Sequence, residues 1–385
     1  MNEFSLHSIT RFSEFLEIKD EWCRFTNRYF PHMYARTHSW LSSWWETYHP
    51  GGAGAIYVQR SHRAGLVAAA PLHIRRESFG GFPVRILTLL GCGIGTEDFL
   101  ISPESKNFIP EVMTAVGESG WDIIRMSRLS EHFAERLEET AVTNGWKVEK
   151  SESTDFLVSL PSDFEEYLSC RSRKFRRNLN QAENRLEREG SVEFLVLDPF
   201  QDTERVLESG RNIARQSWQY GNGVSHFCEE ASNSLYANLT RRQRGAGGED
   251  FNLLLVSGKP VAYLLGCRRG RTYYAIDTAF HRDFQSISAG RVLFARVIGR
   301  LIGERSTDVF DFEGAGHYKD DYATDSRTVK SMILYNRNPY AQLIRLFRRS
   351  RLYSLVRKYR DVRHVNRPGK GYVKEDANES TSSNK

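Results

Sequence analysis

The feature of this sequence that most constrains its fold is a strand–turn–strand pattern that occurs twice. The first copy, AIYVQRSHRAGLVAAAPL, has a polar turn at residues 61–65 before a more apolar second strand. The second copy, LLLVSGKPVAYLLG, has the same plan around a tight turn at residues 258–260. Segments with helical and strand-like periodicity accompany each hairpin in a similar order. The most economical interpretation is one α/β unit that is built twice.

The length of the chain also favours two units, because 385 residues are too many for one ordinary domain. We predict a first unit at residues 1–150, a second at 151–338, a basic helical tail at 339–371 and a disordered C-terminus at 372–385. No signal-peptide pattern or membrane-length apolar run is present, and the five cysteines show no metal-binding or disulfide spacing. We therefore expect a cytoplasmic protein without a metal.

The positive charge of the chain is concentrated near its C-terminus. The chain has 54 Lys and Arg residues and 48 Asp and Glu residues. Residues 341–371 contain ten of the basic residues and one of the acidic residues. The rest of the chain then has 44 basic and 47 acidic residues. A body with slightly more acidic than basic residues argues against nucleic-acid binding through the main units.

A strongly basic segment, SCRSRKFRRNLNQAENRLEREG, spans residues 169–190. Its apolar residues recur at helical spacing, so they predict an amphipathic helix whose buried face contains Leu168, Phe175, Leu179, Ala182 and Leu186. Arg173 and Arg177 lie on the opposite face, and Arg176 lies at its edge. This face is either solvated or, because guanidinium groups bind phosphates well, a phosphate-binding surface of the substrate site.

The segment QSISAG, residues 285–290, leads into a second predicted helix, which opens at residues 289–291. A glycine at a helix start lets backbone N–H groups approach an anion, which the helix dipole also favours. The candidate cofactor-binding residues are Gln285, Ser288, Ala289, Gly290 and Arg291. The alternative is an ordinary N-cap at Ser288 and a packing role for Gly290.

The strand DVFDFEG alternates two aromatic residues with two carboxylates, Asp311 and Glu313. Two carboxylates at a strand end could deprotonate an acceptor, and Glu313 is our first choice for the base. The alternative is that both face solvent or pair with Lys319. Further candidates are the possible proton donors and anion ligands Tyr274, His317, Tyr318 and Lys319, the strand-end residue Asp277, and the aromatic pair Trp218 and Tyr220, which could stack on a sugar or a base.

The order of these motifs is informative. The segments RSRKFRRNL and GKPVAYLLG, the helix start SAG, DFEG and HYK follow one another along residues 171–319. This order resembles the CelD/BcsL-type acetyltransferases of the GNAT superfamily, which are related to the Fem-type aminoacyl transferases with two GNAT units in tandem. The loop at residues 285–290 is similar to the Q-x-x-G-x-G pattern with which GNAT enzymes bind the CoA pyrophosphate, with Ser288 in place of the first glycine.

This resemblance implies an α/β (α+β) fold of two GNAT-like units, each with a mixed, mostly antiparallel sheet flanked by helices. It implies an acetyl-CoA donor and an amine or hydroxyl acceptor on a small molecule or an envelope-glycan precursor. One alternative is a Fem-type transferase that uses aminoacyl-tRNA, and another is an inactive GNAT scaffold that binds a partner.

The tail after Pro339 contains apolar residues at near-helical spacing, with arginines between them. This pattern predicts a basic amphipathic helix, or two short ones. The helix either docks on the second unit with its arginines in water or attaches the protein peripherally to an anionic membrane.

Overall fold

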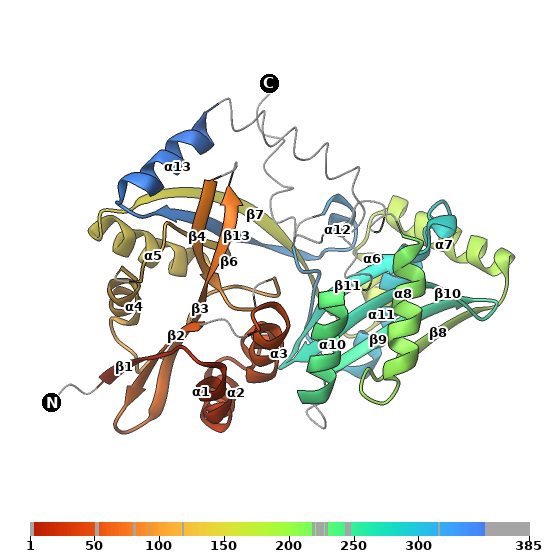
Figure 1. Ribbon diagram of the computed structural model, residues 1–385. Helices are drawn as coiled ribbons and strands as arrows, with labels where there is room; N and C mark the ends of the chain where they lie inside the picture. Colours follow the sequence, from red (N-terminus) through yellow and green to blue (C-terminus); the bar gives the residue numbers. More distant parts are fainter. Residues whose placement is uncertain are drawn as a thin grey trace. The chain divides into compact units, whose positions relative to one another are not determined.

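The computed structural model describes the parts of the chain that are coloured in Figure 1, namely residues 4–50, 54–79, 82–91, 93–117, 119–217, 220, 227, 230–242, 248–314 and 316–350. These residues form two compact units. The first contains the described residues up to Thr154 and those from Thr328 onward, and the second is Asp155–Arg327. Two strands, β7 (Lys147–Ser159) and β13 (Asp325–Tyr335), carry the chain between the units.

The first unit has a mixed β-sheet in which the strand order is β1-β2-β3-β4-β6-β13-β7. Among the described strands of this unit, β4 and β6 form a parallel pair, and the other strand pairs whose residue partners are known are antiparallel. Its other elements are β1 (Phe4–Ile9), α1 (Phe12–Glu17), α2 (Lys19–Tyr29), η1 (Tyr34–Arg36), α3 (His38–Tyr48), β2 (Gly54–Ser61), β3 (Gly65–Phe79), β4 (Phe82–Leu89), β5 (Leu100–Ile101), α4 (Phe108–Gly117), β6 (Ile123–Leu129), α5 (Glu131–Thr143) and α13 (Pro339–Arg349).

The tail helix α13 packs in the first unit, although the sequence alone suggested the second. Ala341 and Ile344 are buried, and Ile344 lies in a cluster with residues of β4, β6 and β13. Pro339 stands in the first turn and Asn338 caps the helix, accepting from the N–H of Ala341 at 2.7 Å. The remainder of the predicted tail, from residue 351, lies outside the described residues.

The second unit also has a mixed sheet, with the strand order β7-β12-β11-β10-β9-β8. Its single parallel pair among the described strands is β11 with β12. Its elements are α6 (Phe164–Ser169), α7 (Arg173–Glu189), β8 (Val192–Leu197), α8 (Thr203–Arg215), α10 (Glu230–Arg242), β9 (Glu249–Val256), β10 (Lys259–Arg269), β11 (Thr272–Phe280), η3 (Arg282–Phe284), α11 (Ala289–Glu304), β12 (Val309–Asp311) and α12 (His317–Asp320).

Helices cover both faces of this second sheet (Figure 1). Helices α7 and α11 pack on the face to which Leu254 and Val256 of β9 point, and α8 packs on the face of Leu253 and Leu255. The predicted apolar face of α7 is confirmed, because Phe175, Leu179, Ala182 and Leu186 are all buried. This helix therefore presents its arginines away from the sheet.

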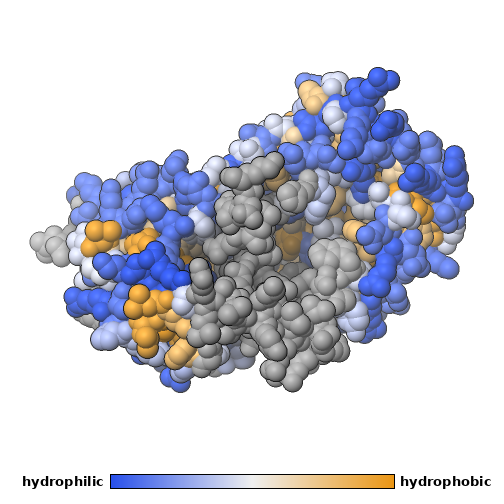
Figure 2. Space-filling model, turned by 90° about the horizontal axis from the view of Figure 1, so that it is seen from above, coloured by the Kyte–Doolittle hydropathy of each residue, from blue (hydrophilic) through white to orange (hydrophobic). Residues whose placement is uncertain are grey.

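The duplicated hairpin is confirmed, as is the α/β fold with a mixed sheet and flanking helices. Strands β2 and β3 form the first hairpin, and β9 and β10 form the second. Each hairpin is followed by a third, antiparallel strand, which is β4 in the first unit and β11 in the second. After a helix, the chain then forms a strand that pairs in parallel with this third strand, namely β6 with β4 and β12 with β11. On the face that Figure 2 shows, hydrophilic residues dominate the described surface, and hydrophobic residues form small separate patches.

Candidate functional site

Helix α11 begins where the sequence predicts, directly after the loop from β11. Its N-cap residue, Ser288, has a left-handed backbone with φ 66°, and its side chain caps no N–H group. The carbonyl of Ser288 accepts from the N–H groups of Arg291 and Val292, at 2.8 and 3.4 Å. The first turn contains no acidic residue. Because the helix dipole is positive here, this helix start is suited to an anion.

The residues around this helix start differ in what they can contribute. Ala289 is fully buried, whereas Gln285 and Ser288 are exposed in the loop. A Cβ atom on Gly290 would lie only 3.2 Å from a ring carbon of Phe280, the last residue of β11. A small residue at position 290 therefore lets the helix start lie close to the end of the strand.

Arg291, the fifth cofactor candidate, is engaged in contacts within the unit. Its guanidinium forms an ion pair with Asp321 at 3.0 Å and lies over the rings of Phe175 and Tyr322, at 5.3 and 5.6 Å from their centres. Its side chain is 18% exposed. The structure therefore gives Arg291 a role in joining α11 to α7 and to the segment after α12.

Strand β11 leads to this helix start with one edge largely open. Its parallel ladder with β12 contains three residue pairs, from Thr272 with Val309 to Tyr274 with Asp311. A β-bulge also makes Ile276 an extra residue relative to β10. Beyond Tyr274, β11 has no partner other than β10 among the described strands.

Asp311, at the end of β12, is fully buried and belongs to an ion-pair network. Arg327 lies 2.6 Å from Asp311 and 3.0 Å from Asp155, which is also buried. Burial alone would lower the pKa of Arg327, but the two carboxylates outweigh it and raise this pKa above its usual value. The N–H of Glu313 also donates to Asp311, at 2.9 Å. Asp311 therefore serves best as a structural anion.

Glu313 occupies a turn that other residues hold in place. It has φ 56° and is followed by Gly314 with φ 98°. The ammonium of Lys319 donates to the carbonyl oxygens of Phe312, Glu313 and Gly314, at 2.9, 3.1 and 3.3 Å. Lys319 thus stabilises the turn, and Glu313, which is partly exposed, is the carboxylate better placed to meet a substrate.

Tyr274 lies opposite Asp311 in the β11–β12 ladder and is 4% exposed. Burial raises the pKa of its hydroxyl, and the nearby carboxylates of Glu313 and Asp311 raise this pKa further. The hydroxyl is therefore protonated at neutral pH and can donate a hydrogen bond. The structure brings Tyr274 close to Asp311 and Glu313.

The substrate candidates are more dispersed. Asp277 is buried and accepts from the hydroxyl of Tyr263 at 3.0 Å, so it has a partner inside the unit. Tyr318 and Tyr220 are about half exposed, at 49% and 52%. His317 is the first residue of α12, and Trp218 lies outside the described residues. Arg173, Arg176 and Arg177 are exposed on α7.

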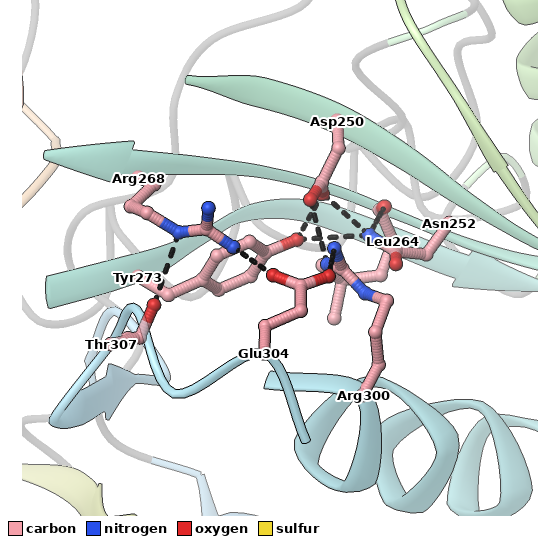
Figure 3. A network of polar contacts seen from close by, with 8 residues as sticks. All are labelled: Asp250, Asn252, Leu264, Arg268, Tyr273, Arg300, Glu304 and Thr307. Atoms are coloured by element: carbon pink, nitrogen blue, oxygen red, sulfur yellow. Dashed lines mark hydrogen bonds and ion pairs between the residues drawn. The ribbon is translucent and has the colours of Figure 1, made fainter. Parts of the chain in front are cut away.

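A buried polar network that the sequence did not indicate lies on the face of the sheet covered by α11 (Figure 3). Arg300 of α11 donates to Asp250 of β9 at 2.6 Å, and the hydroxyl of Tyr273 of β11 donates to the same carboxylate. Asn252 donates to the Tyr273 hydroxyl at 2.8 Å and to the carbonyl of Leu264 at 3.2 Å. The network therefore ties α11 to three strands.

The network continues toward the end of α11. Arg300 also pairs with Glu304 at 2.8 Å, and Glu304 pairs with Arg268, which donates to Thr307 at 3.1 Å. A Cβ atom on Gly266 would lie 2.0 Å from the Tyr273 hydroxyl, so only glycine fits opposite this tyrosine. Asp250, Tyr273 and Arg300 come from three separate elements, β9, β11 and α11, which is why no local pattern revealed the network.

The described residues contain no group of three or more His, Cys, Asp or Glu side chains that could hold a metal ion. No helix formed by them is long and apolar enough to cross a membrane.

A family comparison identifies the part of the chain that contains this site. Residues 173–323 match the model of the acetyltransferase (GNAT) domain. This range lies within the second unit and includes α7, β11, α11 and β12. No curated protein matches the chain.

Solved structures show the same architecture over nearly the whole chain. FemX superposes with a TM-score of 0.58 at 11% identity, over 88% of this chain and 99% of its own. The C-terminal domain of a putative lysylphosphatidylglycerol synthetase from Agrobacterium fabrum gives 0.52 at 12%, over 87% and 95%. L-PGS from Bacillus licheniformis gives 0.51 at 14%, over 90% and 96%. The chain therefore has a fold of this kind, and its second unit contains a GNAT acetyltransferase domain.

Proposed function

We propose that the protein is an acyltransferase that uses an acyl-CoA donor, with acetyl-CoA as the expected one. The observation that carries this proposal is the open edge of β11, which ends at the uncapped start of α11. The N–H groups of Ala289 and Gly290 would bind the pyrophosphate of the donor there. The edge of β11 would hold the chain that carries the thioester, close to Tyr274.

The residues at the β11–β12 ladder would then supply the proton transfers. Glu313 accepts the proton of the acceptor amine or hydroxyl while that group attacks the thioester carbonyl. Tyr274 protonates the departing thiolate and regains a proton from protonated Glu313, so the proton that leaves the acceptor replaces the one that reaches the leaving group. Asp311 and Lys319 act indirectly, since they hold the turn that contains Glu313. Positioning of the two substrates supplies much of the remaining rate.

For the acceptor we propose a small molecule or a glycan precursor with a free amine or hydroxyl. This assignment follows the resemblance to the CelD/BcsL-type enzymes, and exposed Tyr220 and Tyr318 offer faces on which a sugar ring could stack.

A second candidate is a Fem-type transferase that uses aminoacyl-tRNA, which the similarity to FemX favours. The charge of the chain argues against it, because 44 basic and 47 acidic residues lie outside residues 341–371. Binding of aminoacyl-tRNA in a filter assay, together with no binding of acetyl-CoA, would replace our first proposal by this one.

Calorimetric titration with acetyl-CoA tests the donor site. In Gly290→Asp, a carboxylate beside the helix start would repel the pyrophosphate and press on Phe280, so we expect binding at least tenfold weaker than in the wild type. Gly303→Asp is the matched control, because a Cβ there meets nothing within 4 Å at the other end of the same helix. Equal binding by Gly290→Asp and the wild type would remove the donor from this position.

A further inference from the structure

The first turns of α7 form a dense patch of positive charge. Arg173, Lys174, Arg176 and Arg177 are exposed, and none of them pairs with an acidic group in the described part of the chain. We call these four residues the α7 basic patch. Arg171, just before the helix, differs from them, because it donates to the carbonyl of Ala323 and lies over the ring of Tyr167.

The patch is unfavourable for the unit by itself. Like charges within two turns of a helix repel one another, and they lie at the end where the helix dipole is already positive. Packing does not require them, because the buried face of α7 consists of Phe175, Leu179, Ala182 and Leu186. A bound anion would offset this repulsion, so the patch is suited to a negatively charged ligand.

Helix α7 lies beside the start of α11. The guanidinium of Arg291, in the first turn of α11, is 5.3 Å from the ring centre of Phe175, which is on the buried face of α7 in the same two turns as the patch. Arg185 of α7 also donates to the carbonyl of Ser286, in the loop before α11, at 3.2 Å. Asp321, the acid next to Arg291, is already paired with it.

We propose that the α7 basic patch binds the 3′-phosphate on the adenosine of the CoA donor. This inference rests on the proposed function, which brings the pyrophosphate of the same molecule to the start of α11. A phosphomonoester carries close to two negative charges and three acceptor oxygens, which planar guanidinium groups bind in pairs of hydrogen bonds. The patch thereby makes the enzyme selective for CoA over donors without this phosphate.

The test compares two donors that differ only in this group. We expect the full-length wild type to bind acetyl-CoA at least tenfold more tightly than acetyl-3′-dephospho-CoA in calorimetric titration. The patch variant Arg173→Gln/Arg176→Gln/Arg177→Gln should bind acetyl-CoA at least tenfold more weakly and acetyl-3′-dephospho-CoA as the wild type does. The matched control Arg205→Gln/Arg211→Gln/Arg215→Gln removes three charges from α8, on the other face of the sheet, and should keep the preference.

Each other outcome has a distinct meaning. Equal affinity of the wild type for the two donors overturns the inference without any variant. A patch variant that keeps its donor preference but loses affinity for a phosphorylated acceptor, or for RNA, also overturns it. Failure of the wild type to bind either donor is instead the failure of the proposed function, and the inference fails with it.

Discussion

In the first unit the chain passes from β4 through the short strand β5 to α4, and in the second it passes from β11 through η3 to α11. The strand after α4, β6, is parallel to β4, and the strand after α11, β12, is parallel to β11. Both helices begin after a residue with a left-handed backbone, Asn107 with φ 56° and Ser288 with φ 66°. The two units therefore build the same helix start with different side chains.

Those side chains give the two helix starts opposite properties. In α4, Phe108 and Ile109 are fully buried, and Glu111 in the first turn accepts from the side-chain amide of Gln59 at 2.8 Å. In α11, a buried alanine and a glycine take these places, and no acidic residue follows. The fold thus supplies the dipole twice, but the residues permit an anion only in the second unit.

The largest expected effect tests whether the chemistry belongs to the second unit. Glu313→Gln should lower turnover by about 100-fold or more, because the variant cannot accept the proton of the acceptor. Acetyl-CoA binding should change little. The matched control is Arg128→Gln in β6, since Arg128 also has a positive φ, 53°, near the end of the parallel strand of its unit.

Steady-state kinetics and calorimetry on both variants decide this prediction. Wild-type turnover in Glu313→Gln would exclude the residue as the base. Loss of turnover in Arg128→Gln, with the protein still folded, would move part of the chemistry to the first unit.

A smaller effect compares one ion-pair network from each unit. Asp311→Asn leaves Arg327 with Asp155 alone and should lower the free energy of unfolding of the second unit by about 2 kcal/mol. This cost is below the roughly 3–5 kcal/mol that is typical when one partner of a fully buried ion pair is removed, because Arg327 is 32% exposed. Asp122→Asn in the first unit should cost about 1 kcal/mol, because its partner Arg85 is 45% exposed. Hydrogen exchange at the amides of β12 and β4 measures each value. A larger cost for Asp122→Asn would contradict this ranking.

Acid should affect the first unit through His73. Burial lowers the pKa of this imidazole to about 3, with smaller effects from Arg75 and His49. The folded unit therefore keeps His73 neutral while the unfolded chain binds a proton below about pH 6.5, so stability falls as the pH falls from about 6.5 toward 3. At pH 5 the loss should be about 2 kcal/mol.

The replacement His73→Leu checks this assignment. The opening free energies of β3 amides, obtained by dividing each exchange rate by its intrinsic rate at the same pH, should differ much less between pH 7.5 and pH 5 in the variant than in the wild type. The same acid sensitivity in both proteins would assign the effect to other groups.

The smallest expected effect concerns the surface of the first unit. We propose that α13 attaches the protein peripherally to an anionic membrane. Leu343 and Leu346 are 54% and 64% exposed on this helix, and residues 341–371 contain ten basic residues and one acidic residue. Leu343→Glu/Leu346→Glu should reduce co-sedimentation with phosphatidylglycerol vesicles several-fold, because each charge replaces an apolar contact with the lipid.

The control for this experiment is Leu16→Glu/Val142→Glu, which changes exposed apolar residues elsewhere in the same unit, at 37% and 64% exposure. High salt should release the wild type from the vesicles. If Leu343→Glu/Leu346→Glu and the control variant co-sediment equally with the phosphatidylglycerol vesicles, the membrane proposal is wrong. Truncation before α13 is a poor substitute, because Ile344 is part of the core.

The parts of the fold that depend on local patterns could be predicted from the sequence. The apolar stripe of α7 and the repeated hairpins depend on residues a few positions apart, and the structure contains both. The position of β13 could not be predicted in this way. It pairs with β6 about 200 residues earlier, at Lys330 with Leu129, and only long-range packing decides such a pairing.

In the candidate site, too, local patterns predicted some features, and long-range contacts decided the others. Alternation in DVFDFEG correctly placed Phe310 and Phe312 in the apolar core, but it did not show that Asp311 is fully buried as well. The sequence did not show that Arg327 neutralises Asp311 or that Lys319 binds three carbonyl oxygens, because these contacts depend on how two loops meet. Residue type alone made Asp311 and Glu313 look equivalent, and only their surroundings distinguish them.

The return of the chain to the first unit has a consequence for protein synthesis. Residues 155–327 are contiguous, so a ribosome synthesises the whole second unit before it makes most of β13. In the first unit β13 lies between β6 and β7, so that sheet stays incomplete until residue 335 has emerged. At about 5–20 residues per second, the N-terminal part waits on the order of 10–40 s for its missing strand. During that time the edge of β6 is open to wrong partners, and the unit made first is the last to be completed.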